Sequence, residues 1–254
     1  MTITIVDYNV RDYSHDKYDV VFHSETIHTL VTHTPSMVDA WLSNLPRNSH
    51  TSNSLVGLDV EWLPNRQRNM DNPIAIIQLC INRECLVFQI LRASFIPQSL
   101  VAFLENQGNT FVGVGIEQDV EKLLRDYSLR VANFLELRTL ATQRLGEYVR
   151  GAGLKTLAAY VLEDVEKLLK DYSLCITNFL ELRTLATERF GEHMRGTGLK
   201  TLAAHVLGKD IEKPRRITMS RWDNFKLTPQ QVQYACIDAF ASFEIGRILY
   251  DSRV

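Results

Sequence analysis

A near-exact tandem repeat limits the architectures open to this chain. Residues 119–162 align without a gap with residues 164–207 at an offset of 45, and 34 of the 44 positions are identical. Solenoid folds need at least about three repeats, because one unit cannot bury its own apolar face. Two copies this similar favour a recent duplication inside one domain, which leaves 209 of the 254 residues for the underlying fold. An error of gene prediction is the alternative origin, and a transcript across the repeat would distinguish the two.

Hydrophobic periodicity predicts a single α/β domain over residues 1–254. Within residues 1–50, segments 3–10 and 18–31 are rich in β-branched and aromatic residues, which indicates strands, and a short helix opens at Pro35. The N-terminal part is therefore expected to supply strands and one helix.

Strands and helices alternate in the central part of the chain. The apolar run 55–62 predicts a buried strand, and segments 74–80 and 85–90 predict an antiparallel hairpin in which Cys80 faces Cys85. Further elements are expected as a helix at 97–106, a strand at 111–115, a helix at 117–128 and a helix at 232–249. This alternation predicts a mixed sheet flanked by helices.

The two repeat copies end differently. Each copy predicts a helix, a strand and a second helix, which in the first copy are residues 119–127, 134–140 and 154–162. Gly208 is a good C-terminal cap for the last helix of the second copy, whereas Glu163 stands at the equivalent position of the first. One fused helix over 154–172 is therefore expected.

One copy, 119–163 or 164–208, is surplus to the underlying domain and predicts an extra helix–strand–helix insertion. Its strand either joins a sheet edge or the insertion bulges outward as a helical hairpin, and both arrangements remain open. Apolar surface on the insertion would favour dimerisation.

Composition excludes several classes of protein. The formal net charge of −2 gives no overall basic field, so a nucleic-acid partner has to be held by local patches. The 4 cysteines lack paired spacing, which argues against a zinc site and a disulfide framework. The first residues show no export signal, and no apolar run reaches the roughly 18 residues of a membrane helix. We expect a nuclear or cytoplasmic protein that does not bind membranes.

Two acids lie at the end of the predicted strand 55–62. Side chains at i and i+2 of a strand share a face, so Asp59 and Glu61 point toward the same place. Neighbouring carboxylates repel unless a cation lies between them, and Mg²⁺ or Mn²⁺ prefers such oxygens. Taken alone, this short pattern is more often a strand end with solvated acids.

A tyrosine and an acid are one helical turn apart near the C-terminus. Tyr234 and Asp238 share a face of the predicted helix 232–249, where a phenol beside a carboxylate can orient a water molecule. A core tyrosine near a surface acid is the simpler interpretation of this pair alone.

These motifs together resemble the DEDDy class of 3′-5′ exonucleases, and most closely the Werner syndrome-like exonucleases. The resemblance covers nearly the whole chain and includes Gly198-Leu199-Lys200, Ser220-Arg221-Trp222, Leu227-Thr228-Pro229 and Gln231 in the family order. It implies a ribonuclease H-like fold and, as substrate, a nucleic acid with a 3′ end, DNA in preference to RNA. A helicase is a candidate partner on the same grounds.

The resemblance also implies a two-metal hydrolysis with Mg²⁺ or Mn²⁺. The four metal ligands would be Asp59, Glu61, Asp119 and Asp238. Asp59 would bridge both ions, and Glu61 and Asp238 would complete the shell of the ion that activates water. Asp119 would reach the second ion, and Tyr234 would orient the nucleophile.

The third acid is expected to be Asp119 rather than its twin Asp164. Asp119 closely follows the predicted strand 111–115, whereas Asp164 follows a predicted helix. Only Asp119 therefore has a strand that would carry it to the sheet edge.

Basic and aromatic residues near the motifs are candidate substrate contacts. They are Trp62, Arg66, Arg215, Arg216 and Arg221, with Lys213 and Arg68 nearby. Solvated loops and a core tryptophan are the alternatives.

The sequence is consistent with two functions from different classes. The first is an active metal-dependent 3′-5′ exonuclease. The second is a catalytically impaired nucleic-acid-binding or scaffold protein, because a displacement of about 1 Å in the site can lower the rate roughly a hundredfold.

Overall fold

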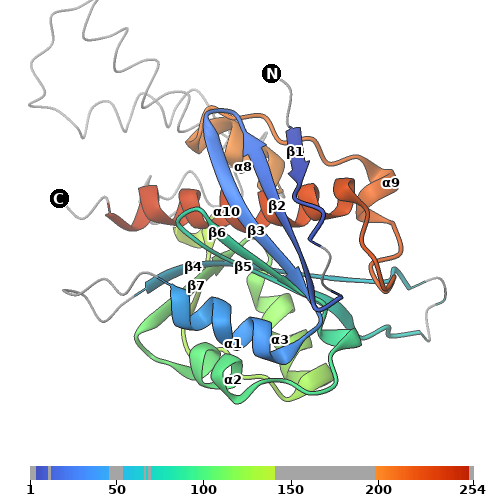
Figure 1. Ribbon diagram of the computed structural model, residues 1–254. Coiled ribbons are helices and arrows are strands. Elements are labelled where there is room, and N and C mark those ends of the chain that lie inside the picture. The colour runs from blue at the N-terminus through green and yellow to red at the C-terminus, as the bar shows by residue number, and fades with distance from the viewer. Residues whose placement is uncertain are drawn as a thin grey trace, which may run out of the picture. The chain divides into compact units, whose positions relative to one another are not determined.

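A computed structural model describes residues 4–10, 13–45, 54–65, 67, 70–140 and 198–251 (Figure 1). The chain divides into two compact units, the first made of residues 1–135 with 213–243 and the second of residues 136–212 with 244–254. Most of the tandem repeat lies outside the described residues. The expected fused helix 154–172 and the fate of the surplus insertion therefore remain predictions.

The first unit is built on a mixed sheet, as the sequence predicts. The strands described are β1 (Thr4–Asp7), β2 (His15–Phe22), β3 (Glu25–Thr32), β4 (Ser54–Trp62), β5 (Ile74–Ile81), β6 (Glu84–Phe88), β7 (Asn109–Gly113) and β8 (Phe134–Glu136). Their order is β1-β2-β3-β6-β5-β4-β7-β8. The β3–β6 and β4–β7 pairs are parallel, whereas β4–β5 and β5–β6 are antiparallel. β4, which carries the first acidic motif, therefore lies inside the sheet.

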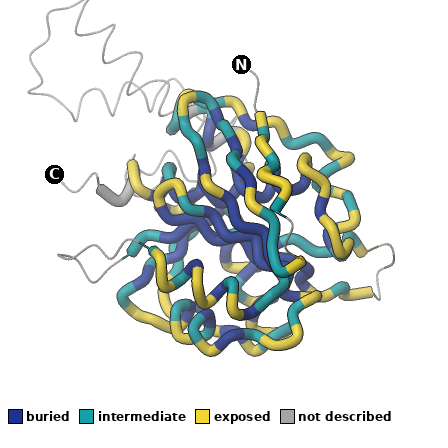
Figure 2. Tube along the Cα trace, viewed as in Figure 1, coloured by how far each residue is buried: buried dark blue, intermediate teal, exposed yellow. Residues whose placement is uncertain are grey.

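Helices cover both faces of this sheet. Helices α1 (Pro35–Asn44), α2 (Gln98–Glu105) and α3 (Ile116–Tyr127) lie on one side, and α10 (Pro229–Asp251) crosses the other (Figure 1). All residues of β5 are buried, and the central strands form the buried centre in Figure 2. A core cluster that includes Trp41, Leu58 and Leu79 fills the space under α1 and α2.

The hairpin of β5 and β6 has the expected register. Cys80 is the partner of Cys85 across the Asn82-Arg83 turn. Both are buried free thiols, as is Cys236.

Several element boundaries differ from expectation. The segment 18–31 is expected to form one strand of a pair, but it contains parts of two strands, β2 and β3, that are joined by a turn at residues 23–24. The strand predicted at 134–140 ends at Glu136, and residues 137–140 are helical. Leu137 and Leu140 are both buried, and their spacing of three suits a helical turn rather than an alternating strand. Helix α10 begins at Pro229, earlier than the predicted 232, because bonds between Thr228 and Gln231 cap its first turn.

The second unit contains α8 (Leu199–Val206). Gly208 follows this helix with a φ of +60°, and the Lys209 N–H donates to the Ala203 carbonyl at 3.2 Å. The predicted helix end at Gly208 is confirmed.

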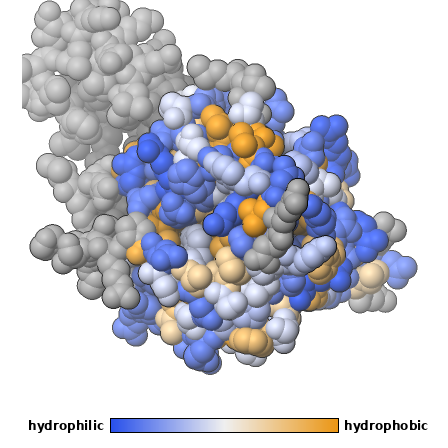
Figure 3. All heavy atoms as spheres, viewed as in Figure 1, coloured by the Kyte–Doolittle hydropathy of each residue, from blue (hydrophilic) through white to orange (hydrophobic). Residues whose placement is uncertain are grey.

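The face of the molecule shown in Figure 3 is mainly hydrophilic, with separate apolar patches. Within the described ranges, no helix combines the length and apolar character needed to cross a bilayer.

Candidate active site

Strand β4 directs both of its acids toward helix α10. Gly57 lies on the same strand face as Asp59 and Glu61. A Cβ atom placed on Gly57 would collide with the Ala239 carbonyl oxygen of α10 and lie 2.8 Å from the Phe243 nitrogen. The side chains of Asp59 and Glu61 therefore project from the α10 side of the sheet, as the alternation of the strand predicts.

Asp238 of α10 completes a carboxylate cluster with Asp59 and Glu61. One carboxylate oxygen from each residue lies within 4.8 Å of the others, and this is the group of potential metal ligands found among the described residues. Asp238 is buried, and its Oδ1 atom has no hydrogen-bond partner in the described part of the chain. The structure thus brings together three of the four predicted metal ligands.

A capping box fixes the start of α10. The Thr228 N–H donates to Gln231 Oε1 at 3.0 Å, and the Gln231 N–H donates to Thr228 Oγ1 at 3.3 Å. Gln231 also donates from Nε2 to Ser220 Oγ at 2.9 Å. These bonds tie the preceding loop to the helix turn that leads to Tyr234.

Tyr234 lies one turn before Asp238, on the same helix face. Its ring lies 5.8 Å from the ring of the buried Trp222, measured between centroids. Burial and the charges of Asp238 and Glu61 raise the pKa of the Tyr234 phenol well above its ordinary value. The phenol therefore keeps its proton at neutral pH and can donate a hydrogen bond.

The Lys213 ammonium lies against the carboxylate cluster. Its Nζ donates to Asp238 Oδ2 at 2.5 Å and to the Tyr234 hydroxyl at 3.3 Å. The sequence places Lys213 near the candidate substrate contacts, but its direct contact with the acids was not predicted. Lys213 and Tyr234 are 21 positions apart on different elements, so no periodic spacing could have revealed the contact.

Asp119 lies near this cluster but outside the group of mutually close oxygens. Gly115 precedes α3 with a φ of +81°, a left-handed conformation that favours glycine, and Asp119 follows in the first helical turn. Asp119 is buried, and its charge contributes to the raised pKa of Glu61. The structure therefore places Asp119 within electrostatic reach of the cluster.

Helix α3 is fastened to the sheet beside Trp62. Lys122 Nζ lies 3.1 Å from Asp126 Oδ2 and 5.1 Å from the centroid of the Trp62 indole. Asp126 Oδ2 in turn accepts the Ile74 N–H at 3.0 Å. These contacts hold the helix that carries Asp119 against the start of β5.

The carboxylates carry a large electrostatic cost when no cation is present. Burial and the charge of Asp238 raise the pKa of Asp59 to about 7, against the opposing effect of Lys213. Burial and the charges of Asp59 and Asp238 raise the pKa of Glu61 to about 10. Burial lowers the pKa of Lys213, but attraction to Asp238 and Asp59 outweighs it and the net shift is upward. One charged lysine therefore compensates only part of the cluster.

Without divalent ions, the protein should lose stability between about pH 5 and about pH 8. The pKa of folded Asp59, about 7, exceeds the ordinary value of 3.8, so the folded state binds more protons in this range. The stability given by protonated Asp59 is complete below 3.8 and is lost as the pH rises through 7. Thermal unfolding in EDTA at both pH values measures the loss, which should be smaller in Asp59→Asn. Equal losses in the two proteins would contradict the assignment to Asp59.

The candidate substrate contacts are dispersed. Trp62 is partly buried, packs against the core cluster and has Lys122 over its ring. Arg215 and Arg216 are exposed on α9 (Arg215–Thr218). Arg221 is exposed and its guanidinium lies 2.7 Å from Asp223. Arg66 and Arg68 lie outside the described residues, and binding by the whole set remains a prediction.

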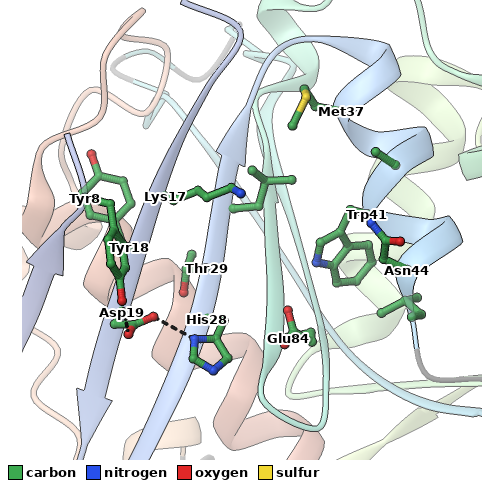
Figure 4. Close-up of a pocket in the computed structure, with 13 residues that line it drawn as sticks. Tyr8, Lys17, Tyr18, Asp19, His28, Thr29, Met37, Trp41, Asn44 and Glu84 are labelled. Atoms are coloured by element: carbon green, nitrogen blue, oxygen red, sulfur yellow. Dashed lines mark hydrogen bonds and ion pairs between the residues drawn. The ribbon is translucent and has the colours of Figure 1, made fainter. Parts of the chain in front are cut away.

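A separate pocket of about 370 Å³ lies on the α1 side of the sheet. Figure 4 shows Trp41 and Asn44 of α1 facing Lys17, Asp19 and His28 of β2 and β3 across it. None of the clustered carboxylates lines this pocket, because their side chains project from the α10 side of the sheet. The pocket is therefore distinct from the candidate metal centre.

Comparisons with known proteins agree with this arrangement. A family model described as 3′-5′ exonuclease matches residues 34–166 and 161–252, two segments that overlap where one repeat copy gives way to the next. The bifunctional 3′-5′ exonuclease/ATP-dependent helicase WRN of Mus musculus is 31% identical over 197 residues, 77% of this chain and 10% of that protein. A 3′-5′ exonuclease of Arabidopsis thaliana is 28% identical over 200 residues, 78% of this chain and 53% of that protein.

The fold is also shared with a solved structure. The crystal structure of Escherichia coli RNase D, an exoribonuclease involved in structured RNA processing, matches with a TM-score of 0.56 and 16% identity. The match covers 87% of this chain and 44% of RNase D, and it supports the fold alone. The chain spans about half or less of the length of these relatives. Since the family model matches more than half of its residues, the chain belongs to the 3′-5′ exonuclease family.

Proposed function

We propose that the chain hydrolyses nucleic acid from the 3′ end with two divalent ions, Mg²⁺ or Mn²⁺. The observation that carries the proposal is the cluster of Asp59, Glu61 and the buried Asp238, with oxygens within 4.8 Å of one another. The repulsion within this cluster falls when a hard cation binds between the carboxylates. Asp119 is proposed as the fourth ligand.

The residues present fit such ions. Asp238 Oδ1 is buried and has no hydrogen bond in the described part of the chain, so a lone pair remains for a cation. All donors in the cluster are carboxylate oxygens, the ligand type that Mg²⁺ and Mn²⁺ prefer. When bound, such ions lower the pKa of an attacking water and stabilise the leaving oxygen.

The protein's own groups would orient the reaction. Asp59 would hold both ions in place, and Glu61 with Asp238 would fix the position of the attacking water. The Tyr234 phenol accepts a hydrogen bond from Lys213 and retains its own proton, so it would orient the nucleophile rather than act as a base. The Lys213 ammonium is close enough to the cluster to help neutralise charge that develops on the substrate phosphate.

DNA is the proposed preferred substrate, on the basis of the resemblance to Werner syndrome-like exonucleases. RNA is the competing substrate class, since RNase D, with the same fold, is an exoribonuclease. The test is incubation of the purified protein with a 3′-recessed, end-labelled duplex and with an RNA of the same sequence, in Mg²⁺, Mn²⁺ or EDTA. Stepwise shortening from the 3′ end only with metal would support the proposal. Intact ends on both substrates, with folding verified, would contradict it.

Replacing Lys213 with Met should destabilise the metal-free protein. Breaking a fully buried ion pair costs several kcal/mol, but 27% of the Lys213 side chain is exposed, so we expect a loss of about 2 kcal/mol. Mn²⁺ should reverse most of the loss, because it neutralises the same carboxylates. Denaturant unfolding in EDTA and in Mn²⁺ measures both effects, with Lys226→Met on the exposed surface as the control. An equal loss in both conditions would show that Lys213 stabilises the fold independently of the cluster.

The tandem repeat favours a second candidate, a nucleic-acid-binding protein with impaired turnover. Deleting residues 119–163 tests it, because Asp164 then follows Gln118 and an acid is retained at the junction. If the duplication displaces a ligand, the shortened protein should hydrolyse the labelled duplex faster than the full chain. A full chain that is already as active as the shortened one would contradict impairment.

A further inference from the structure

Gln78 is a fully buried polar residue in the middle of β5. Its exposed fraction is 0%, and neither its Nε2 nor its Oε1 atom has a hydrogen-bond partner in the described part of the chain. Every neighbour of Gln78 along β5, from Ile74 to Ile81, is apolar or a cysteine. An unpaired buried amide is costly, and a leucine or methionine of similar size would avoid the cost. Its presence therefore calls for a physical reason.

The sheet register places Gln78 beside the first acid of the cluster. Gln78 is the direct antiparallel partner of Asp59, and paired residues project from the same face of a sheet with Cβ atoms about 4.5–5.5 Å apart. That face is the α10 side, because Gly57 meets α10 and is two positions from Asp59. The register irregularity of β4 lies between Glu61 and Trp62, beyond this pair. A glutamine side chain is long enough to bring its amide to the neighbouring carboxylate.

Of the two residues that pair with Gln78 across the sheet, only Asp59 offers a hydrogen-bonding side chain. On its opposite side, Gln78 pairs with Val87, whose side chain offers no hydrogen-bonding atom. An amide also adds no charge to a cluster that already holds three acids. It can donate to a carboxylate oxygen without competing with a cation for the oxygen's other lone pair.

The geometry points to Gln78 as a positioning residue for the metal site, whose side-chain N–H holds the Asp59 carboxylate when divalent ions are bound. This inference rests on the proposed function, since it assigns Gln78 a role toward the same ions. Groups that hydrogen-bond to a metal ligand fix its orientation, and removing one typically lowers metal affinity by about 10–100-fold. Gln78 would not touch the substrate or the reacting atoms.

The test is Gln78→Met, which keeps the length of the side chain and removes both polar atoms. Leu79→Met on the opposite face of β5 is the matched control for repacking of the core. Titration calorimetry with Mn²⁺ should show an affinity at least about tenfold lower in Gln78→Met and unchanged in Leu79→Met. The melting temperature in EDTA should not fall, because the variant removes an unpaired amide. The kcat on the labelled duplex should fall while KM stays constant.

Three outcomes would overturn the inference. Unchanged Mn²⁺ affinity in Gln78→Met, with an active wild-type protein, would overturn this inference and leave the proposed function standing. A lower melting temperature of Gln78→Met in EDTA would assign the residue a purely structural role. A wild-type protein that neither binds Mn²⁺ nor cleaves the duplex would overturn the proposed function and the inference with it.

Discussion

Replacing Asp59 with Asn should lower the rate of 3′-end hydrolysis by at least about 10³-fold, because placement of charge at the site supplies most of the transition-state stabilisation. Asp59 shares the α10 side of β4 with Glu61 and is the proposed ligand of both ions. Asn keeps the shape of the side chain but removes its charge, so the fold should remain intact. Single-turnover shortening of the labelled duplex in Mg²⁺ measures the rate. A residual rate close to that of wild type would exclude Asp59 from the reaction.

The two copies of the repeat supply a matched pair of controls. Asp119→Asn should reduce the rate strongly, since Asp119 lies in the first turn of α3 and its charge reaches Glu61. Asp164→Asn changes the equivalent residue of the second copy and should leave the rate unchanged. The reverse pattern would show that the second copy supplies the third acid.

Gly57→Ala should destabilise the fold by about 3 kcal/mol, because overpacking a rigid contact costs this much when backbone has to move. The added Cβ would collide with the Ala239 carbonyl oxygen and approach the Phe243 nitrogen to 2.8 Å. Both atoms belong to the backbone of α10, which cannot turn away as a flexible side chain can. Relief requires α10 to separate from the sheet, which would also move Asp238 away from Asp59.

Urea unfolding in EDTA measures the effect of Gly57→Ala without a contribution from metal binding. Gly198→Ala is the control, because a Cβ at Gly198 meets nothing within 4 Å and its φ of −87° suits any residue. The control should unfold close to wild type. If Gly57→Ala unfolds at the same urea concentration as Gly198→Ala, α10 does not approach β4 as closely as described.

Much of the fold was predictable because its elements carry strong local patterns. The largely apolar run of β5 and the helical spacing of Val120, Leu123 and Leu124 in α3 identify their elements without tertiary information. The alternation of β4 was also enough to place Asp59 and Glu61 on one face. These parts of the site follow from periodicity alone.

Other parts of the site depend on contacts between distant segments. Lys213 reaches Asp238 from the segment that precedes α9, and no spacing in the sequence encodes this contact. Gln78 is one polar residue in a hydrophobic strand, and only the register of the sheet pairs it with Asp59. The early end of β8 likewise depends on the burial of Leu137. A pattern of β-branched and apolar residues in the sequence does not specify that burial.

Sequence changes before and after the register irregularity between Glu61 and Trp62 have different consequences for β4. A slip of one residue before it would turn Asp59 and Glu61 toward α1 and α2 and present Leu58 and Val60 to α10. Pairing with β5 on one side and β7 on the other opposes such a slip. Beyond the irregularity, insertions and deletions can accumulate in the loop after Trp62 without altering the phase of the strand. Relatives should therefore differ in length after this tryptophan while the spacing of the two acids stays fixed.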